Sequence, residues 1–187
     1  MSTIFETERL VIRRIRADDA EACQVWMGDP EVARYEYWDP YALDDLRAEL
    51  AELAGVPPGT IGAWNLHGVV HKETGAIIGC VLIRMNDEIH RQAEIGFHFH
   101  KGHWGRGFAT EAARGLLAYG FDVFHAHRIY GVADARNAAS IRVMEKLGMR
   151  REALMRENTF VKGEWCDEVV YAILESARRP CSPPKEA

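Results

Sequence analysis

The sequence predicts an α+β domain in which helices cover a mostly antiparallel sheet. Three β-like runs follow one another between residues 64 and 100 with only short turns between them, which is typical of an antiparallel meander. Amphipathic helical segments precede and follow this meander. The chain has 187 residues, of which 48% are hydrophobic and 27% are charged, and this composition fits a single folded domain.

The elements before the meander are a strand and two helices. Residues 9–16 form the strand, because apolar side chains recur there at every second position. Asp18 or Asp19 then caps a helix that runs to about residue 27, and a second helix covers residues 43–54. The apolar face of the second helix consists of Leu43, Leu46, Leu50 and Leu53.

The meander and the elements after it complete the domain. Strands are expected over residues 64–71, 77–85 and 92–100, followed by a helix over 107–119, a strand over 128–133, a helix over 138–147 and strands over 149–160 and 165–174. Gly148 ends the second of these helices in a left-handed cap. The domain therefore spans residues 1–176, and residues 177–187 are expected to be a disordered tail because they contain few apolar side chains.

Charge excludes one class of function and is compatible with another. Lys and Arg number 23 against 28 Asp and Glu, so the chain lacks the basic excess of a nucleic-acid binder. Residues 1–60 carry 13 acids and 6 bases, whereas residues 61–187 carry 15 acids and 17 bases. This asymmetry suits an enzyme that joins a cationic substrate to an anionic cofactor.

Cysteine and histidine patterns give no support for a metal site. The four cysteines are widely spaced and form no CxxC pair, so we expect reduced thiols in a cytoplasmic protein. His98, His100 and His103 lie close in sequence, but without an HExxH pattern they predict no metal ion. No stretch approaches 18 consecutive apolar residues, and the chain is expected to be neither secreted nor membrane-spanning.

A glycine-rich segment at residues 102–112 stands between a predicted strand and an amphipathic helix. Such a turn directs unpaired backbone N–H groups and the positive end of a helix dipole at one point, which favours phosphate binding. Gly105 and Gly107 allow a pyrophosphate to approach the backbone closely, and Arg106 adds positive charge. The segment is neither GxGxxG nor GxxxxGK[ST], so a nucleotide-binding enzyme is a weaker alternative.

Six short segments stand out along the chain: ERL at 8–10, EIGF at 94–97, WGRGFATEA at 104–112, NAAS at 137–140, EKLGM at 145–149 and KGEWCD at 162–167. In this order they resemble the GNAT superfamily of N-acetyltransferases, and most closely its ribosomal-protein N-terminal acetyltransferases of the RimJ/RimL type. The resemblance spans roughly residues 7–175. It implies the acyl-CoA N-acyltransferase fold, with about seven strands and about four helices. Trp104 departs from the Gln or Arg common in the wider superfamily, but the RimJ/RimL branch accepts an aromatic residue there.

The resemblance implies acetyl-CoA as the cosubstrate, with its pyrophosphate on residues 104–110 and its pantetheine arm along the strand before them. The residues expected to bind it are Phe97, His98, Phe99, Trp104, Gly105, Arg106, Gly107, Phe108, Ala109, Thr110, Asn137 and Ser140. Asn137 is also a candidate helix cap, with Ser140 bonding locally in the first turn, and both roles are compatible.

Three groups carry the expected chemistry. Glu94 matches the family's general base, although a strand Glu paired with Arg or Lys is an alternative explanation for it. Many GNAT enzymes protonate the departing thiolate with a Tyr, but that position is Met144 here and Met has no proton to donate. Ser140, three residues after Asn137, is the substitute that the RimJ/RimL branch implies.

Aromatic residues between two prolines fit the acceptor side of the family. Tyr35, Tyr37 and Trp38 are expected to hold a cationic amine, with packing between helices as the alternative. The sequence thus predicts direct transfer of acetyl, within a ternary complex, to a primary amine, first of all the α-amine of a protein N-terminus. A small amine or antibiotic as acceptor, and a non-catalytic acyl-CoA sensor, stay open, as does assembly into a homodimer.

Overall fold

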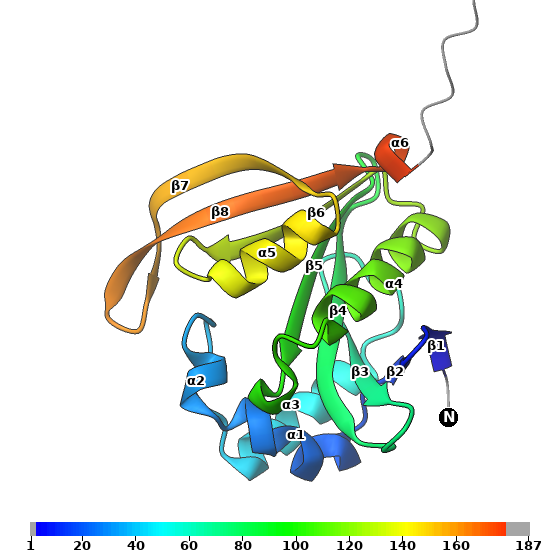
Figure 1. The fold of residues 1–187 in the computed structure, drawn as a ribbon, viewed down its shortest axis with the longest axis vertical. Helices are drawn as coiled ribbons and strands as arrows, with labels where there is room; N and C mark the ends of the chain where they lie inside the picture. The colour runs from blue at the N-terminus through cyan, green and yellow to red at the C-terminus, as the bar shows by residue number, and fades with distance from the viewer. Residues whose placement is uncertain (1–2, 179–187) are drawn as a thin grey trace, which may run out of the picture.

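The computed structural model describes residues 3–178, and in it one β-sheet is covered by helices on both faces (Figure 1). The elements are β1 (Thr3–Glu6), β2 (Leu10–Arg14), the 3-10 turn η1 (Ala17–Asp19), α1 (Ala20–Met27), α2 (Pro30–Ala33), α3 (Leu43–Gly55), β3 (Asn65–His71), β4 (Ile77–Asp87), β5 (Gln92–Phe99), the 3-10 turn η2 (Lys101–His103), α4 (Phe108–Asp122), β6 (Arg128–Asp134), α5 (Ala138–Lys146), β7 (Arg150–Val161), β8 (Glu164–Leu174) and α6 (Glu175–Arg178). This is the α+β class that the sequence predicts.

The sheet contains one parallel pair of strands, and that pair opens along its length. Within residues 3–178, eight strands run in the order β1-β2-β3-β4-β5-β6-β8-β7, and only β5 and β6 are parallel neighbours. Their pairing covers Gln92–Glu94 and Arg128–Tyr130 and then stops, although both strands continue. Beyond Glu94 the edge of β5 that faces β6 has no strand partner, so backbone N–H and C=O groups are left free there.

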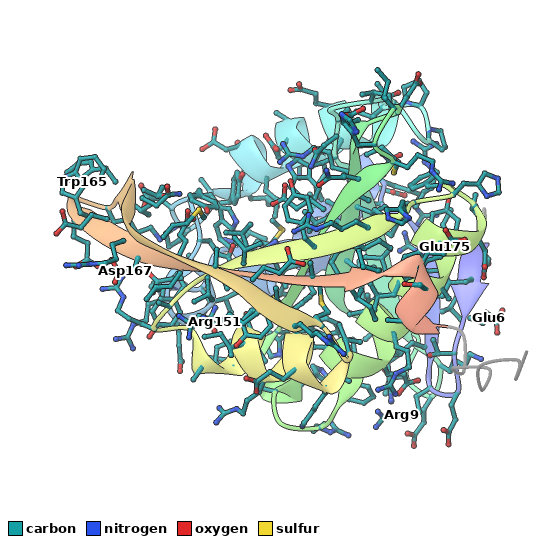
Figure 2. All side chains as sticks on the ribbon, turned by 90° about the horizontal axis from the view of Figure 1, so that it is seen from above. Glu6, Arg9, Arg151, Trp165, Asp167 and Glu175 are labelled. Carbon is teal, nitrogen blue, oxygen red and sulfur yellow. The ribbon has the colours of Figure 1, made fainter. Side chains whose placement is uncertain are left out.

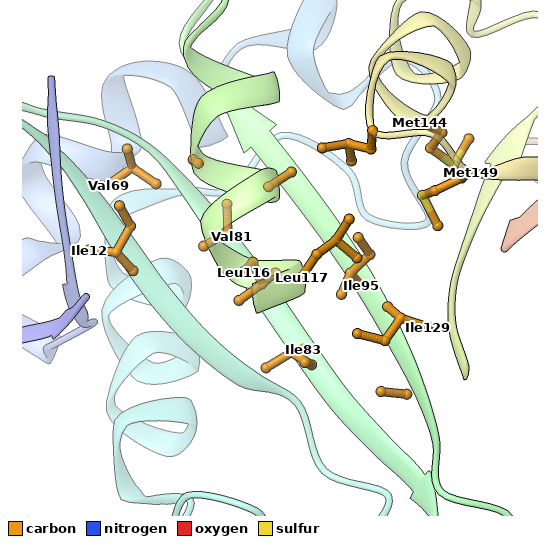
Figure 3. Close-up of a cluster of buried hydrophobic side chains, with 14 of the residues drawn as sticks. Ile12, Val69, Val81, Ile83, Ile95, Leu116, Leu117, Ile129, Met144 and Met149 are labelled. Carbon is orange, nitrogen blue, oxygen red and sulfur yellow. The ribbon is translucent and has the colours of Figure 1, made fainter. Parts of the chain in front are cut away.

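Two hydrophobic clusters hold the helices to the two faces. The larger one packs α4 onto the sheet, with Leu116, Ile83 and Ile129 fully buried (Figure 3). The smaller one places Trp26 of α1 and Leu50 of α3 against the opposite face. Successive side chains along each strand point to opposite faces of the sheet, so each strand contributes to both clusters. A shift of one residue in strand pairing would exchange the two faces, so the clusters fix the register of the strands.

The structure differs from the predicted elements mainly in short segments toward the two ends of the domain. Residues 3–178 contain eight strands and six α-helices where about seven and about four are predicted, because β1 and the four-residue helices α2 and α6 are too short to show a periodic pattern. Asp19 occupies the N-cap position of α1, as predicted, but its carboxylate makes no cap hydrogen bond to that helix. The Asp19 carboxylate instead accepts from Arg16 N at 2.9 Å and binds the Arg13 guanidinium, which closes η1.

Gly148 adopts the left-handed conformation predicted for it, with φ of 80°. Of the predicted tail, residues 177–178 belong to α6 and residues 179–187 lie outside the described part of the chain. No helix in residues 3–178 has both the length and the apolar character that crossing a bilayer requires.

Candidate active site

A cleft of about 330 Å³ lies where β5 and β6 separate. The free half of β5, the loop before α4, helix α5 and the segment around α2 form its walls. Eleven of the twelve residues expected to bind acetyl-CoA line it, namely Phe97, His98, Phe99, Trp104, Gly105, Gly107, Phe108, Ala109, Thr110, Asn137 and Ser140. Sequence motifs from three separate segments therefore converge on one cavity.

The amino end of α4 has the geometry of an anion site. Gly105 and Gly107 have φ of 73° and 83°, a left-handed conformation that costs side-chain-bearing residues free energy. No side chain caps α4 at Gly107, so the first N–H groups of the helix stay available to a ligand. The positive end of the helix dipole adds to their attraction for an anion.

Arg106 is the residue of this loop that does not line the cleft. Its guanidinium lies over the ring of Phe108, 5.1 Å from the ring centre, and its side chain is exposed. The structure therefore does not place this cation on the cleft wall, and its contact with the ligand stays a prediction. Arg106 lies between two left-handed glycines, and its exposed side chain stands outside the cleft that both glycines line.

The free edge of β5 forms a second polar surface in the cleft. Residues 95–99 pair with β4 on one side only, so the N–H and C=O groups on the other side face the gap. The Trp104 indole donates from Nε1 to the Phe99 carbonyl at 2.7 Å and ties the anion-binding loop to the end of this strand. The loop and the strand edge thus form one continuous binding surface for an extended ligand.

Glu94 stands at the inner end of the gap, where the pairing of β5 with β6 stops. Its side chain is 16% exposed, and Arg84 Nη2 donates to its Oε2 at 2.5 Å. The Tyr130 hydroxyl donates to the same oxygen at 3.3 Å and itself accepts from the Asn86 amide at 2.6 Å. No described residue donates to Oε1, so one carboxylate oxygen is held while the other remains available.

Comparison with known proteins identifies the kind of site. Residues 9–150 match the acetyltransferase (GNAT) domain family. The chain belongs to the GNAT acetyltransferase family. An uncharacterized N-acetyltransferase of Bacillus licheniformis, p20, is 32% identical over 176 residues, which cover 94% of this chain and 97% of that protein. The chain is accordingly an N-acetyltransferase, and acetyl-CoA is its acetyl donor.

Solved GNAT structures share the fold along nearly the whole chain. An acetyltransferase of the GNAT family from Bacillus anthracis superposes with a TM-score of 0.82 at 32% identity and covers 94% of this chain and 99% of its own. The spermidine N-acetyltransferase of Vibrio cholerae, solved with CoA and spermine, gives a TM-score of 0.78 at 23% identity and covers 91% and 98%. The latter likeness concerns the fold alone.

In the wall formed by α5, Met144 takes the position at which many GNAT enzymes have a Tyr. Met144 is 2% exposed and packs against Gly131, so its side chain belongs to the core and not to the cleft. Asn137 Oδ1 accepts from Ser140 N at 3.1 Å, which confirms that Asn137 is the helix cap. The Ser140 side chain lies on the cleft wall one turn before Met144.

The aromatic segment after α2 divides between two roles. Trp38 packs on Tyr41 and His98, as an anchor between elements would. The Tyr37 ring is exposed, but its hydroxyl donates to the buried carboxylate of Glu168, and burial of the hydroxyl together with Glu168 raises the pKa of Tyr37. Tyr35 lines the cleft, and the guanidinium of Arg34 lies over its ring, 5.1 Å from the ring centre. The segment therefore forms both a support and a wall of the GNAT cleft.

Glu36 and His98 add a titratable pair to the same wall. Glu36 Oε1 lies 3.3 Å from His98 Nδ1. Burial of the ring disfavours the charged imidazolium, but the Glu36 carboxylate outweighs burial and raises the pKa of His98. Among the described residues no group of three or more His, Cys, Asp or Glu side chains is arranged to hold a metal ion.

Sequence reasoning missed several residues of the cleft. They are Glu31, Val32, Arg34, Glu36, His103, Ala139, Arg142, Val143 and Lys146. Arg142 and Lys146 could have been found, because they stand four residues apart on a predicted helix and so share one of its faces. The residues around α2 gave no such signal, since nothing local in the sequence places that segment opposite α5.

Proposed function

We propose that the protein transfers acetyl from acetyl-CoA directly to the α-amine of a protein N-terminus. The single observation that carries the proposal is the opening between β5 and β6, which has an uncapped helix terminus at one end and the Glu94 carboxylate at the other. An extended thioester fits such a gap, with its pyrophosphate at α4 and its acetyl group near Glu94. A Bacillus subtilis relative provisionally named as a ribosomal N-acetyltransferase, YdaF, is 26% identical over 187 residues and supports this acceptor class.

In the proposed reaction Glu94 prepares the nucleophile. An ammonium has no lone pair to react, so Glu94 Oε1 takes a proton from it, directly or through water. The neutral nitrogen then attacks the thioester carbonyl carbon, and a backbone N–H near Phe97 on the free β5 edge stabilises the developing oxyanion. Arg84 and Tyr130 hold Oε2 and thereby direct Oε1 toward the acceptor.

Ser140 completes the proposed reaction at the leaving group. The C–S bond breaks as the tetrahedral intermediate collapses, and the thiolate takes a proton from the Ser140 hydroxyl or from a water that it orders. Ser140 suits this role because it lies on the cleft wall, whereas Met144 is buried and has no proton to give. Solvent then returns a proton to the serine.

Replacing Ser140 by alanine is expected to lower kcat about tenfold or more while leaving CoA affinity within about twofold, because the proposed role of the hydroxyl is at the leaving group and the other eleven residues expected to bind acetyl-CoA are unchanged. The acetyl transfer rate and calorimetric CoA binding are to be measured on the same preparation. Unchanged kcat would show that the thiolate takes its proton elsewhere. A matched control is Ser176→Ala, which removes a hydroxyl from the distant helix α6.

The acceptor is tested by measuring free thiol released from acetyl-CoA in the presence of candidate amines. Peptides with free N-termini, polyamines and aminoglycosides form the three arms of the screen. We expect the largest kcat/KM with a peptide whose N-terminus is free and no release with the same peptide after N-terminal blocking. Release with none of the amines, together with tight acyl-CoA binding, would favour a sensor over an enzyme.

A polyamine is the second candidate acceptor, and the surroundings of Tyr37 favour it. Glu36, Glu94 and Glu168 all act electrostatically on its hydroxyl. Glu168 is only 5% exposed, and its carboxylate accepts from two neutral donors, the Tyr37 hydroxyl and the Asn158 amide. A carboxylate in such surroundings favours a cation as a further partner.

Glu168→Gln therefore separates the two acceptors. If the acceptor is a polyamine, the KM for spermidine is expected to rise about tenfold and kcat to change little. The reason is that the loss of one buried contact between a carboxylate and an ammonium lowers affinity by about that factor. The KM for a peptide with no second positive charge should stay near its wild-type value. Equal effects on both acceptors would argue against a polyamine, and Glu175→Gln on α6 is the control for loss of a carboxylate.

We also propose a cytoplasmic location, which rests on the cysteines. Cys23, Cys80 and Cys166 are buried free thiols, and buried thiols of this kind are common where the surroundings are reducing. Burial raises the pKa of Cys23 to about 12, so this thiol stays protonated and unreactive at neutral pH. Homodimerisation stays a prediction.

A further inference from the structure

The N-terminal hairpin packs against α4, although the two lie about a hundred residues apart in the sequence. The ring of Phe5 on β1 lies so close to Gly115 that a Cβ there would come within 2.3 Å of a ring carbon. The turn between β1 and β2 then reaches the first turn of α4, where Arg9 N donates to Glu111 Oε1. Figure 2 shows Arg9 on the same side of the molecule as Glu6 of β1. The hairpin therefore fixes where the amino end of α4 stands relative to the sheet.

Arg9 and Glu111 form a dense set of contacts at this junction. Glu111 Oε2 accepts from Arg9 Nε at 2.7 Å and lies 2.6 Å from Nη2, while Oε1 accepts from Arg9 N at 2.8 Å and from the Thr7 hydroxyl at 2.6 Å. Burial disfavours the charged carboxylate, but these donors outweigh burial and lower the pKa of Glu111. Both carboxylate oxygens are thus occupied, and Glu111 does not line the cleft.

This pairing removes an electrostatic conflict. An acid in the first turn of α4 would repel an anion bound at the same helix terminus. Paired with the Arg9 guanidinium and bonded to Thr7, the Glu111 charge is compensated locally. The site keeps the positive end of its helix dipole for the ligand.

Arg9 also reaches the anion-binding loop itself. Its Nη1 donates to the Arg106 carbonyl at 3.1 Å, and its guanidinium lies over the Phe108 ring, 4.3 Å from the ring centre. Because a trans peptide is planar, the C=O of Arg106 and the N–H of Gly107 point in opposite directions. A carbonyl held by Arg9 therefore turns the Gly107 N–H away from Arg9, and Gly107 is one of the residues lining the cleft.

We infer that Arg9 is a positioning residue for the pyrophosphate of acetyl-CoA. Its guanidinium bridges the Glu111 carboxylate and the Arg106 carbonyl, and by doing so it fixes the orientation of the peptide that presents the Gly107 N–H to the ligand. Arg9 does not line the cleft and needs no contact with the ligand. The inference rests on the proposed role of this loop as the pyrophosphate site, and it gives the ERL motif at residues 8–10 a function.

The test compares ligands with and without a pyrophosphate. In Arg9→Gln, calorimetry is expected to show about tenfold weaker CoA binding, the effect of one misdirected hydrogen bond to a charged group. Arg9→Lys keeps the charge beside Glu111 but lacks the fork that bridges two acceptors, so it should recover only part of this loss. With acetyl-pantetheine, which has no pyrophosphate, kcat/KM for the amine found in the acceptor screen should stay within about twofold of wild type.

Lys72→Gln is the matched control from the same junction. Lys72 donates to the Thr7 carbonyl at 2.7 Å and pairs with Glu6, so its loss weakens the hairpin without touching the loop. CoA affinity equal to wild type in Arg9→Gln would overturn the inference. Equal losses with acetyl-CoA and acetyl-pantetheine, or an equal loss in Lys72→Gln, would also overturn it, because the hairpin would then act only on general stability. If wild-type protein fails to bind CoA, the pyrophosphate site itself is wrong, and that outcome is separate from the others.

Discussion

Replacing Glu94 by glutamine is expected to lower kcat/KM for the acceptor amine at pH 7 by about a hundredfold or more, the usual size of a general-base contribution. Glutamine keeps the shape of the side chain but accepts no proton. The available oxygen at the inner end of the gap would then no longer help to produce the neutral amine. The measurement is steady-state thiol release with the best acceptor of the screen.

The pH dependence of this loss separates a base from a structural residue. An α-amine has a pKa of about 8, so above that pH most of the acceptor is already neutral in solution. The deficit of Glu94→Gln relative to wild type should therefore shrink between pH 7 and pH 9. A deficit of constant size, or a matching loss of CoA affinity, would show that Glu94 only holds the sheet together. Glu88→Gln, an exposed acid in the turn before β5, is the control.

The ion pair of Glu94 with Arg84 does not exclude the proposed role. Sequence reasoning left two possibilities open, a base and a paired strand carboxylate, and the structure contains the pair. Arg84 and Tyr130 are the cross-strand neighbours of Glu94 on either side, so the sheet itself brings them to one of the two carboxylate oxygens. Pairing through one oxygen leaves the other free for proton transfer.

The parts of the site that the sequence predicted well are local. The loop before α4 and the cap at Asn137 each depend on a few consecutive residues, and glycine conformation and helix capping are short-range effects. The meander could be predicted for the same reason, since its turns are short and its strands are regular. The departure of Arg106 from the cleft wall could not, because it depends on how two left-handed glycines turn the chain between them.

The parts that could not be predicted depend on pairs of residues far apart in the chain. Arg9 and Glu111 are 102 positions apart, and Tyr37 and Glu168 are 131 apart. Propensity and periodicity describe single segments, so they contain no information about which segment lies opposite another. The strand β1 is a further case, because its four residues are held by pairing with β2 and by Phe5 on α4 rather than by a pattern of their own.

His67 is a buried histidine whose ring nitrogens both lack a hydrogen-bond partner among the described residues. It is 3% exposed on β3, beneath α4 and against the ring of Tyr119. Burial, together with the nearby charge of Arg14, lowers the pKa of His67 to about 4 from an ordinary value of 6.5. The folded protein thus keeps this ring neutral at pH values where the unfolded chain protonates it.

Acid is therefore expected to destabilise the fold through His67. Above pH 6.5 the ring is neutral in both states and has no effect, and as the pH falls toward 4 only the unfolded state gains the proton. The free energy of unfolding should fall by roughly 2 to 3 kcal/mol from this group between pH 7 and pH 4.5. Urea unfolding at these two pH values measures the change.

Two variants isolate the contribution of His67 from packing. His67→Leu and His67→Gln fill the site differently and will differ in stability at pH 7, because leucine removes a buried polar group whereas glutamine retains one. Neither side chain titrates, so both variants should lose the same share of the acid sensitivity. A change in packing alone would shift the free energy of unfolding equally at both pH values. If both variants still lose as much of this free energy between pH 7 and pH 4.5 as the wild type does, the destabilising proton binds at another group.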